Sequence, residues 1–109
     1  MNKDEFQYIE ICPVSDLEPG ERLEIELEDF SIVLFRIGES YHAIGNLCTH
    51  DNGPIGEGEI DGSEIICPRH GARFDINSGK ATRLPAVVGI PVYPVRVTGD
   101  TIQIGIPER

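Results

Sequence analysis

Cys48-Thr49-His50 and Cys67-Pro68-Arg69-His70-Gly71 are the two segments that decide the fold of this chain of 109 residues. Each is a short box that combines a cysteine with a histidine, and sixteen residues separate His50 from Cys67. Two thiolates and two imidazoles can bind either a tetrahedral zinc ion or a [2Fe-2S] cluster in which histidines replace cysteines on one iron. Structural zinc sites usually pair ligands of one type in each box. The mixed boxes therefore favour the two-metal cluster, because each loop can give one ligand to each iron.

The two boxes resemble those of Rieske [2Fe-2S] proteins, in which the first box reads C-x-H and the second reads C-x-x-H-G. The resemblance implies one [2Fe-2S] cluster, with Cys48 and Cys67 on an inner iron and His50 and His70 on an outer iron near the surface. It extends to a third, proline-bearing loop after the second box, where this chain has Leu84-Pro85-Ala86. These four box residues are the expected cofactor-binding and metal-binding residues, and no catalytic residue is expected.

Composition places limits on the class of protein. A chain of this length makes one domain. The longest apolar run, Ile32 to Phe35, is too short to cross a membrane, and the first residues lack the apolar stretch of a signal peptide. The formal charge of −10 disfavours nucleic acid and favours a basic protein partner. Three cysteines suit thiolate ligation better than a secreted disulfide framework, so we expect a cytoplasmic protein that binds neither membrane nor nucleic acid.

Sequence patterns outside the boxes indicate β-strands and turns. Apolar and charged residues alternate strictly from Arg22 to Glu28, which is typical of a half-exposed strand. Gly99-Asp100 has the composition of a two-residue hairpin turn. Twelve glycines and eight prolines leave little room for helices. The other strands expected from these patterns are 30–37, 41–44, 91–98 and 101–106.

Residues 45–86 differ in texture from the rest, because they are rich in glycine, proline, asparagine and aspartate and contain both boxes. Short strands at 64–67 and 73–76, with a turn at 77–80, are expected within them. The sequence therefore predicts an all-β fold. A Rieske-type antiparallel sandwich or open barrel, made of residues 1–44 and 87–109, forms the base, and residues 45–86 form an inserted cluster-binding subdomain of one Rieske domain.

Four positions indicate a low reduction potential. High-potential members of the family carry an extra cysteine in each box, and the two form a disulfide, whereas this chain has Gly53 and Arg69. The same members have a serine and a tyrosine that donate to cluster or ligand sulfur, where this chain has Ala72 and Phe74. Donors stabilise the more negative reduced cluster, so their loss lowers the potential. This pattern is typical of the ferredoxins of aromatic-ring-hydroxylating dioxygenases.

Three remaining features carry no function in this interpretation. His42 is expected to be a surface or half-buried strand residue, and Cys12 a small apolar strand residue. Gly53, Gly56 and Gly58 lack the strand-turn-helix context of a nucleotide-binding loop, so they are interpreted as providing loop flexibility.

We therefore expect a soluble one-electron carrier that is not an enzyme. The resemblance implies transient docking of a flavoprotein reductase and a terminal oxygenase at the cluster tip, and we expect a monomer. A complete oxygenase site would need two further histidines and a carboxylate, and only His42 remains after the boxes. Two alternatives are a small Rieske-like subunit of a nitrite-reductase-type complex, and a structural zinc module.

Overall fold

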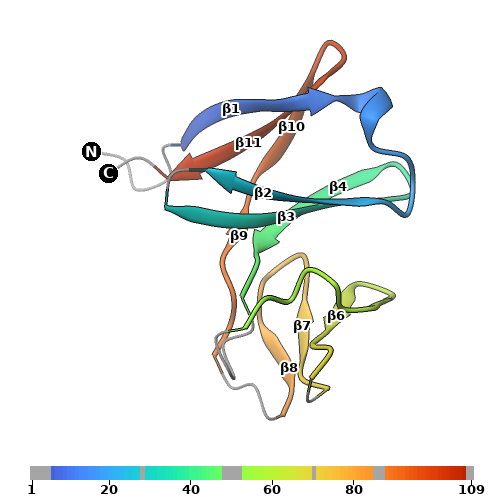
Figure 1. Ribbon diagram of the computed structural model, residues 1–109, viewed down its shortest axis with the longest axis vertical. Helices are drawn as coiled ribbons and strands as arrows, with labels where there is room; N and C mark the ends of the chain where they lie inside the picture. Colours follow the sequence, from blue (N-terminus) through green and yellow to red (C-terminus); the bar gives the residue numbers. More distant parts are fainter. Residues whose placement is uncertain (1–5, 28, 48–52, 70, 85–87, 108–109) are drawn as a thin grey trace.

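The computed structural model describes residues 6–27, 29–47, 53–69, 71–84 and 88–107 (Figure 1). Across these residues the chain is made of strands and turns, with a single 3-10 turn, Val14–Asp16, as its helical element. The sequence prediction of an all-β fold is confirmed.

The strands form three antiparallel sheets (Figure 1). Two sheets make the upper lobe, which we call the base, and the third sheet with its flanking loops makes the lower lobe, which we call the tip. In the base, the outer sheet has the order β1-β11-β10 and the middle sheet β2-β3-β4-β9; the tip sheet is β5-β6-β7-β8. The strands are β1 (Phe6–Pro13), β2 (Arg22–Leu27), β3 (Phe30–Ile37), β4 (Ser40–Gly45), β5 (Ile60–Asp61), β6 (Glu64–Ile66), β7 (Arg73–Asp75), β8 (Ala81–Arg83), β9 (Val92–Tyr93), β10 (Val95–Thr98) and β11 (Thr101–Pro107).

The middle sheet is buried on both faces. Successive side chains of a strand point to opposite faces, and the four consecutive residues 32–35 of β3 are all at most 2% exposed. Ile32 and Leu34 pack in a core shared with the outer sheet, whereas Val33 and Phe35 pack in a core shared with the tip. The uninterrupted apolar run of β3 is therefore explained by two cores on its two sides.

Each of the two cores joins the middle sheet to one neighbour. The base core lies between the outer and middle sheets and consists of Leu17, Ile32, Leu34, Ala43, Tyr93, Ile102, Ile104 and Ile106. The tip core lies between the middle sheet and the tip and consists of Val33, Phe35, Ile44, Ile55, Ile65, Cys67, Ala72, Phe74, Ile76 and Ile90. The predicted ligand Cys67 is thus also a core residue of the tip.

The sequence predicts one strand over residues 91–98, but the structure divides it. β9 pairs with β4 in the middle sheet, whereas β10 pairs with β11 in the outer sheet. Pro94 stands at the division, and it cannot donate to either ladder because proline has no N–H. The prediction of a single strand is therefore wrong, and the chain crosses from one base sheet to the other at this proline.

The tip sheet is a meander of four short strands. The predicted strands 64–67 and 73–76 are observed as β6 and β7, each one residue shorter. β5 and β8 were not predicted, because two or three residues give no measurable alternation of apolar and polar side chains. The predicted turn at 77–80 is observed, and the Gly79 N–H donates to the Asp75 carbonyl at 2.7 Å.

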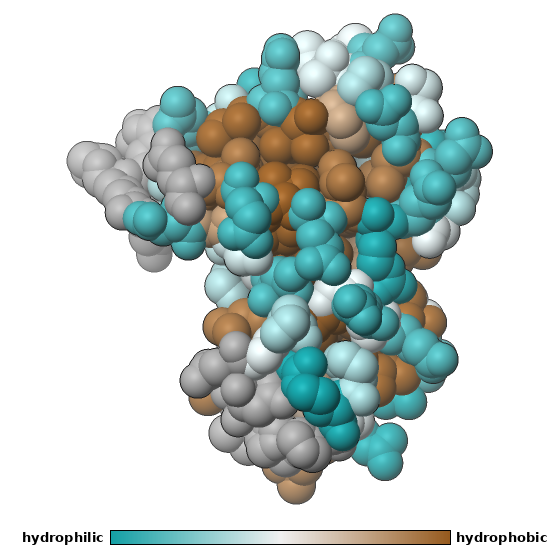
Figure 2. All heavy atoms as spheres, in the orientation of Figure 1, coloured by the Kyte–Doolittle hydropathy of each residue, from teal (hydrophilic) through white to brown (hydrophobic). Residues whose placement is uncertain are grey.

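The surface of the base is uneven in polarity. Figure 2 shows apolar atoms in view between the two base sheets, with hydrophilic side chains around them. The partly buried residues of that core include Ile9, Ile11, Ile25 and Leu27 from the strands β1 and β2. Among the described residues, no helix has the length and apolar character needed to cross a membrane.

We expect Phe35→Ala to lower the free energy of unfolding by about 3–5 kcal/mol, because it removes a buried ring between the middle sheet and the tip. Leu23 is 39% exposed on the neighbouring strand, so Leu23→Ala is a matched control that should cost only about 1–1.5 kcal/mol. Chemical denaturation of the three proteins gives both values. Equal losses of unfolding free energy in the two variants would contradict the conclusion that packing of the tip on the middle sheet stabilises the fold.

Candidate metal centre

Of the four predicted ligands, the structure describes Cys67, which lies directly after β6 and is 1% exposed. Cys48, His50 and His70 lie outside the described residues. The predicted third loop begins at Leu84, which is 72% exposed. Its other residues, 85–87, also lie outside the described part of the chain.

The second box occupies a tight loop between β6 and β7. The Cys67 N–H donates to the Ala72 carbonyl at 2.7 Å, and the Gly71 N–H donates to the Cys67 carbonyl at 3.1 Å. Gly71 has φ +77°, in the left-handed region that residues with a Cβ rarely adopt, and no atom lies within 4 Å of where its Cβ would be. The glycine after the second histidine is therefore required by its backbone conformation. Within the described residues, no protein atom crowds it.

The surroundings of Cys67 suit a thiolate bound to metal. A buried thiolate in an apolar core is costly unless a cation compensates its charge. Ala72 and Phe74, both fully buried, share the tip core with Cys67. The described members of this core are Val, Phe, Ile, Ala and Cys, so none of their side chains offers a hydroxyl donor. The described part of the site thus fits an iron-sulfur cluster, and the sequence prediction of few side-chain donors holds for this core.

The loop that follows the first box is fixed to the middle sheet by Asn46. The Asn46 side-chain oxygen accepts from the N–H groups of Ile55 and Gly56 at 2.9 and 2.8 Å. Its amide nitrogen donates to Glu24 of β2 at 3.1 Å. One side chain at the end of β4 therefore connects the loop to two strands of the base.

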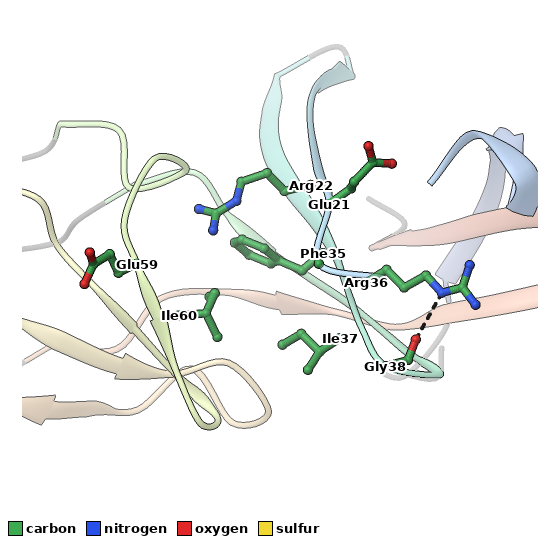
Figure 3. Close-up of a pocket in the computed structure, with 9 residues that line it drawn as sticks. Glu21, Arg22, Phe35, Arg36, Ile37, Gly38, Glu59 and Ile60 are labelled. Atoms are coloured by element: carbon green, nitrogen blue, oxygen red, sulfur yellow. Dashed lines mark hydrogen bonds between the residues drawn. The ribbon is translucent and has the colours of Figure 1, made fainter. Parts of the chain in front are cut away.

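Arg22 of β2 makes a second connection from the base to the same loop. Its Nη1 atom donates to the carbonyl oxygens of Gly56 and Gly58, each at 2.6 Å, and its guanidinium lies over the Phe35 ring, 4.9 Å from the centroid. Figure 3 shows Arg22 extending beside Phe35 toward the tip. The guanidinium thus donates to two carbonyls of loop residues, which lie outside the hydrogen-bonded ladders of the sheets.

Packing determines the glycine at position 58 of this loop. A Cβ on Gly58 would lie 2.1 Å from the Ile66 carbonyl oxygen, which is far too close. The Gly58 N–H also donates to the Ile55 carbonyl at 2.9 Å. The interpretation of Gly58 as a source of loop flexibility is therefore wrong, because the loop lies against β6 at this point.

A cleft of about 420 Å³ runs between base and tip (Figure 3). Phe35, Ile37 and Ile60 form its apolar part. Arg36 faces away from Arg22 in this view and donates to the Gly38 carbonyl at 3.1 Å. The cleft thus lies at the boundary between base and tip, where side chains of the tip core reach the surface.

The two residues left without a role in the sequence lie in the base. His42 is a half-buried residue of β4, and burial lowers its pKa from the ordinary value. Cys12 lies in β1 and packs against the base core; burial, and secondarily Asp16, raises the pKa of its thiol. The predictions that His42 is a half-buried strand residue and Cys12 a small apolar strand residue are confirmed.

Residues 7–94 match the family described as Rieske [2Fe-2S] domain. The match covers most of the sequence, and the chain belongs to this family. The family implies an iron-sulfur cluster as cofactor, in agreement with the chemistry around Cys67.

Relatives of known type include ferredoxin subunits. The chain is 41% identical over 98 residues to the 3-phenylpropionate/cinnamic acid dioxygenase ferredoxin subunit of Escherichia coli strain K12, covering 89% of this chain and 92% of the relative. The ferredoxin of carbazole 1,9a-dioxygenase from Nocardioides aromaticivorans IC177 has a similar structure, with a TM-score of 0.84, 31% identity, and coverage of 93% of this chain and 98% of that chain.

Two further solved structures bear on function. A chain in the complex of reduced oxygenase and oxidized ferredoxin of carbazole 1,9a-dioxygenase superposes with a TM-score of 0.85 at 26% identity, covering 94% of this chain and 95% of that chain. A putative NADH-dependent nitrite reductase small subunit from Mycobacterium tuberculosis superposes with a TM-score of 0.82 at 27% identity, covering 97% and 100%.

Sequence reasoning did not find Arg22 and Asn46 as residues that position the loop after the first box. Asn46 follows β4 directly and stands two residues before the first box, so its place near the site could have been noticed. Arg22 is 26 positions away from Cys48 and lies in a strand whose alternation explains it as a surface charge. Only the packing of β2 beside the tip loop reveals its role.

Arg22→Met keeps an apolar stem of similar length but removes both hydrogen bonds to the loop carbonyls. Because the carbonyls of Gly56 and Gly58 are then left without this donor, we expect a loss of roughly 2–3 kcal/mol in the free energy of unfolding. Arg83 is exposed on the tip strand β8, and Arg83→Met should have little effect. Denaturation curves that coincide for Arg22→Met and wild type would contradict the role assigned to Arg22.

Proposed function

We propose that this protein is a one-electron carrier, a Rieske ferredoxin that passes electrons from a flavoprotein reductase to the terminal oxygenase of an aromatic-ring dioxygenase system. The observation that carries the proposal is the 41% identity to a dioxygenase ferredoxin subunit over nine tenths of both chains. The terminal oxygenase of carbazole 1,9a-dioxygenase from Nocardioides aromaticivorans IC177 is matched over only 31% of its own length, at 22% identity. The carrier itself is not an enzyme and needs no substrate site.

Four residues are proposed to hold one [2Fe-2S] cluster: Cys48 and Cys67 on the inner iron, and His50 and His70 on the outer iron. When bound, such a cluster accepts and releases a single electron. Residues 45–86 would act as the cluster-binding subdomain, and residues 1–44 and 87–109 as the base. The burial of Cys67 and its closed loop support this assignment.

The partners are proposed to dock at the tip. Three apolar side chains are exposed on segments next to the ligand loops, Leu47 at 37%, Leu84 at 72% and Val88 at 61%. Apolar residues at the centre of a contact exclude water, and the net charge of −10 elsewhere would attract a basic partner. Such a docking surface would be used in turn by reductase and oxygenase, with the carrier as a monomer in the cytoplasm.

The alternative is a small subunit of a nitrite-reductase-type complex. The structural similarity to a putative subunit of that type, at 27% identity, keeps it as a candidate. The higher identity to a dioxygenase ferredoxin and the presence of all four box residues favour the electron carrier. Stable copurification with a large sirohaem protein would favour the alternative instead.

Electron transfer is tested directly by stopped-flow mixing of the reduced protein with an oxidised dioxygenase terminal oxygenase. We expect the absorbance of the oxidised carrier to return at a rate proportional to oxygenase concentration. A carrier that stays reduced with every dioxygenase oxygenase tested, and yet reduces a nitrite reductase large subunit, would overturn the proposal.

Ligand substitution tests the assignment of the four box residues. We expect Cys48→Ser, Cys67→Ser, His50→Ala and His70→Ala each to abolish the visible absorption of the cluster, since each removes one metal-ligand bond. His42→Ala is the matched control, because His42 lies in β4 of the base, and it should keep the wild-type spectrum. Loss of colour in His42→Ala with retention in His50→Ala would show that the assignment is wrong.

Hydroxyl donors test the low potential. We expect Ala72→Ser and Phe74→Tyr each to raise the midpoint potential by roughly tens of millivolts, because a donor to sulfur stabilises the reduced cluster and about 59 mV corresponds to a tenfold change for one electron. Ala72→Val adds bulk without a donor and should not raise it. Protein-film voltammetry gives the three midpoints, and unchanged or lower values for both hydroxyl variants would contradict the argument.

A further inference from the structure

Arg69 connects the two ligand loops. It stands in the second box, immediately before His70, and its Nη1 atom donates to the carbonyl oxygen of Pro54 at 2.9 Å. Pro54 belongs to the loop that follows the first box, four residues after His50. A side chain from one box is therefore hydrogen-bonded to the backbone beside the other.

Gly53 provides the space for this connection. A Cβ at this position would lie 2.8 Å from both Cζ and Nη2 of Arg69, and 3.1 Å from Nε. The guanidinium thus occupies the space that a side chain at position 53 would need. The φ angle of Gly53 is outside the left-handed region, so alanine could adopt the same backbone conformation. The steric contact with Arg69, and not the backbone conformation, therefore explains the glycine at position 53.

We propose that Arg69, seated on Gly53 and bonded to Pro54, is a positioning residue that holds the two ligand loops together without a covalent bond. Gly53 and Arg69 occupy the two positions at which high-potential relatives have a disulfide. A guanidinium donates in a fixed planar fork, which suits it to hold a backbone carbonyl while lying on a flat surface. This inference rests on the proposed function, because it takes the two boxes as ligands of one cluster.

The connection completes a series of contacts from the base to the second box. Asn46 and Arg22 fix residues 55–58 to the middle sheet, and Arg69 fixes the second box to the start of that same segment. If Arg69 is removed, the contacts of residues 55–59 with the middle sheet and with Ile66 remain, but the hydrogen bond between the second box and Pro54 is lost. A cluster bridging the loops would then be lost more readily, because both pairs of ligands must stay in place together.

The test is a double-mutant cycle on the purified holoprotein, with Arg69→Ala, Gly53→Ala and the double variant. The methyl group of Gly53→Ala displaces the guanidinium without changing any charge, so it should reproduce Arg69→Ala. Arg96 is a matched control, since it is an exposed arginine of the base that lies over Tyr8 and donates to Gln103. The readouts are the rate at which the visible absorption is lost with an iron chelator present, and the midpoint potential.

We expect both single variants to lose the cluster about two- to tenfold faster than wild type, which is the range for the net loss of one solvent-exposed hydrogen bond. The double variant should be no faster than Arg69→Ala, and Arg96→Ala should match wild type. Both single variants should also lower the midpoint, since a displaced cation stabilises the reduced cluster less. If Arg69→Ala or Gly53→Ala is purified without the cluster while Arg96→Ala retains it, the result also supports the proposal, because it is the strongest form of the expected loss.

The proposal would be overturned if Gly53→Ala lost the cluster at the wild-type rate, or if the effects of the two substitutions added in the double variant. It would also be overturned if Arg96→Ala lost the cluster as fast as Arg69→Ala, because that would indicate a general effect of net charge. These results leave the cluster assignment intact. A wild-type protein without any visible cluster would instead overturn the proposed function, and with it the role given to Arg69, so the two failures are distinguishable.

Discussion

The burial of the middle sheet on both faces is the constraint on which the rest of the structure depends. β3 places Ile32 and Leu34 in one core and Val33 and Phe35 in the other. The outer sheet and the tip each pack on the middle sheet through one of these cores. Because one strand belongs to both cores, a one-residue change in its register would move every side chain to the opposite face. The tip is thereby fixed in direction by the same strand that organises the base.

The tip itself is held by apolar packing on one side and by polar contacts on the other. Its core includes Cys67, so the proposed inner ligand is part of the hydrophobic packing. The loops outside that core have few apolar residues, and side chains such as Arg22, Asn46 and Arg69 bond their backbone groups instead. Loop carbonyls and N–H groups need such partners, since they have none in a strand. The loop after the first box and the described part of the second box are thus held by side chains that are not among the proposed ligands.

The sequence was sufficient for the features that depend on local chemistry. Mixed cysteine and histidine boxes predicted the family, and the apolar run of β3 predicted its strand. Features that depend on contacts between distant segments were not predicted. The division at Pro94 follows from which sheet each half of the segment meets, and the rigidity at Gly58 follows from a carbonyl of β6 eight residues away. The role of Arg22 required the loop carbonyls 34 and 36 positions along the chain. Alternation of polar and apolar residues carries no information about such partners.

The proposed function requires that the tip bind an iron-sulfur cluster whose ligands come from both boxes. The visible absorption spectrum of the purified wild-type protein, recorded before and after dithionite and combined with metal analysis, tests it most directly. We expect a red-brown protein that contains iron and whose colour bleaches on reduction. A colourless protein that contains zinc, with its boxes intact, would instead identify the site as a structural zinc module.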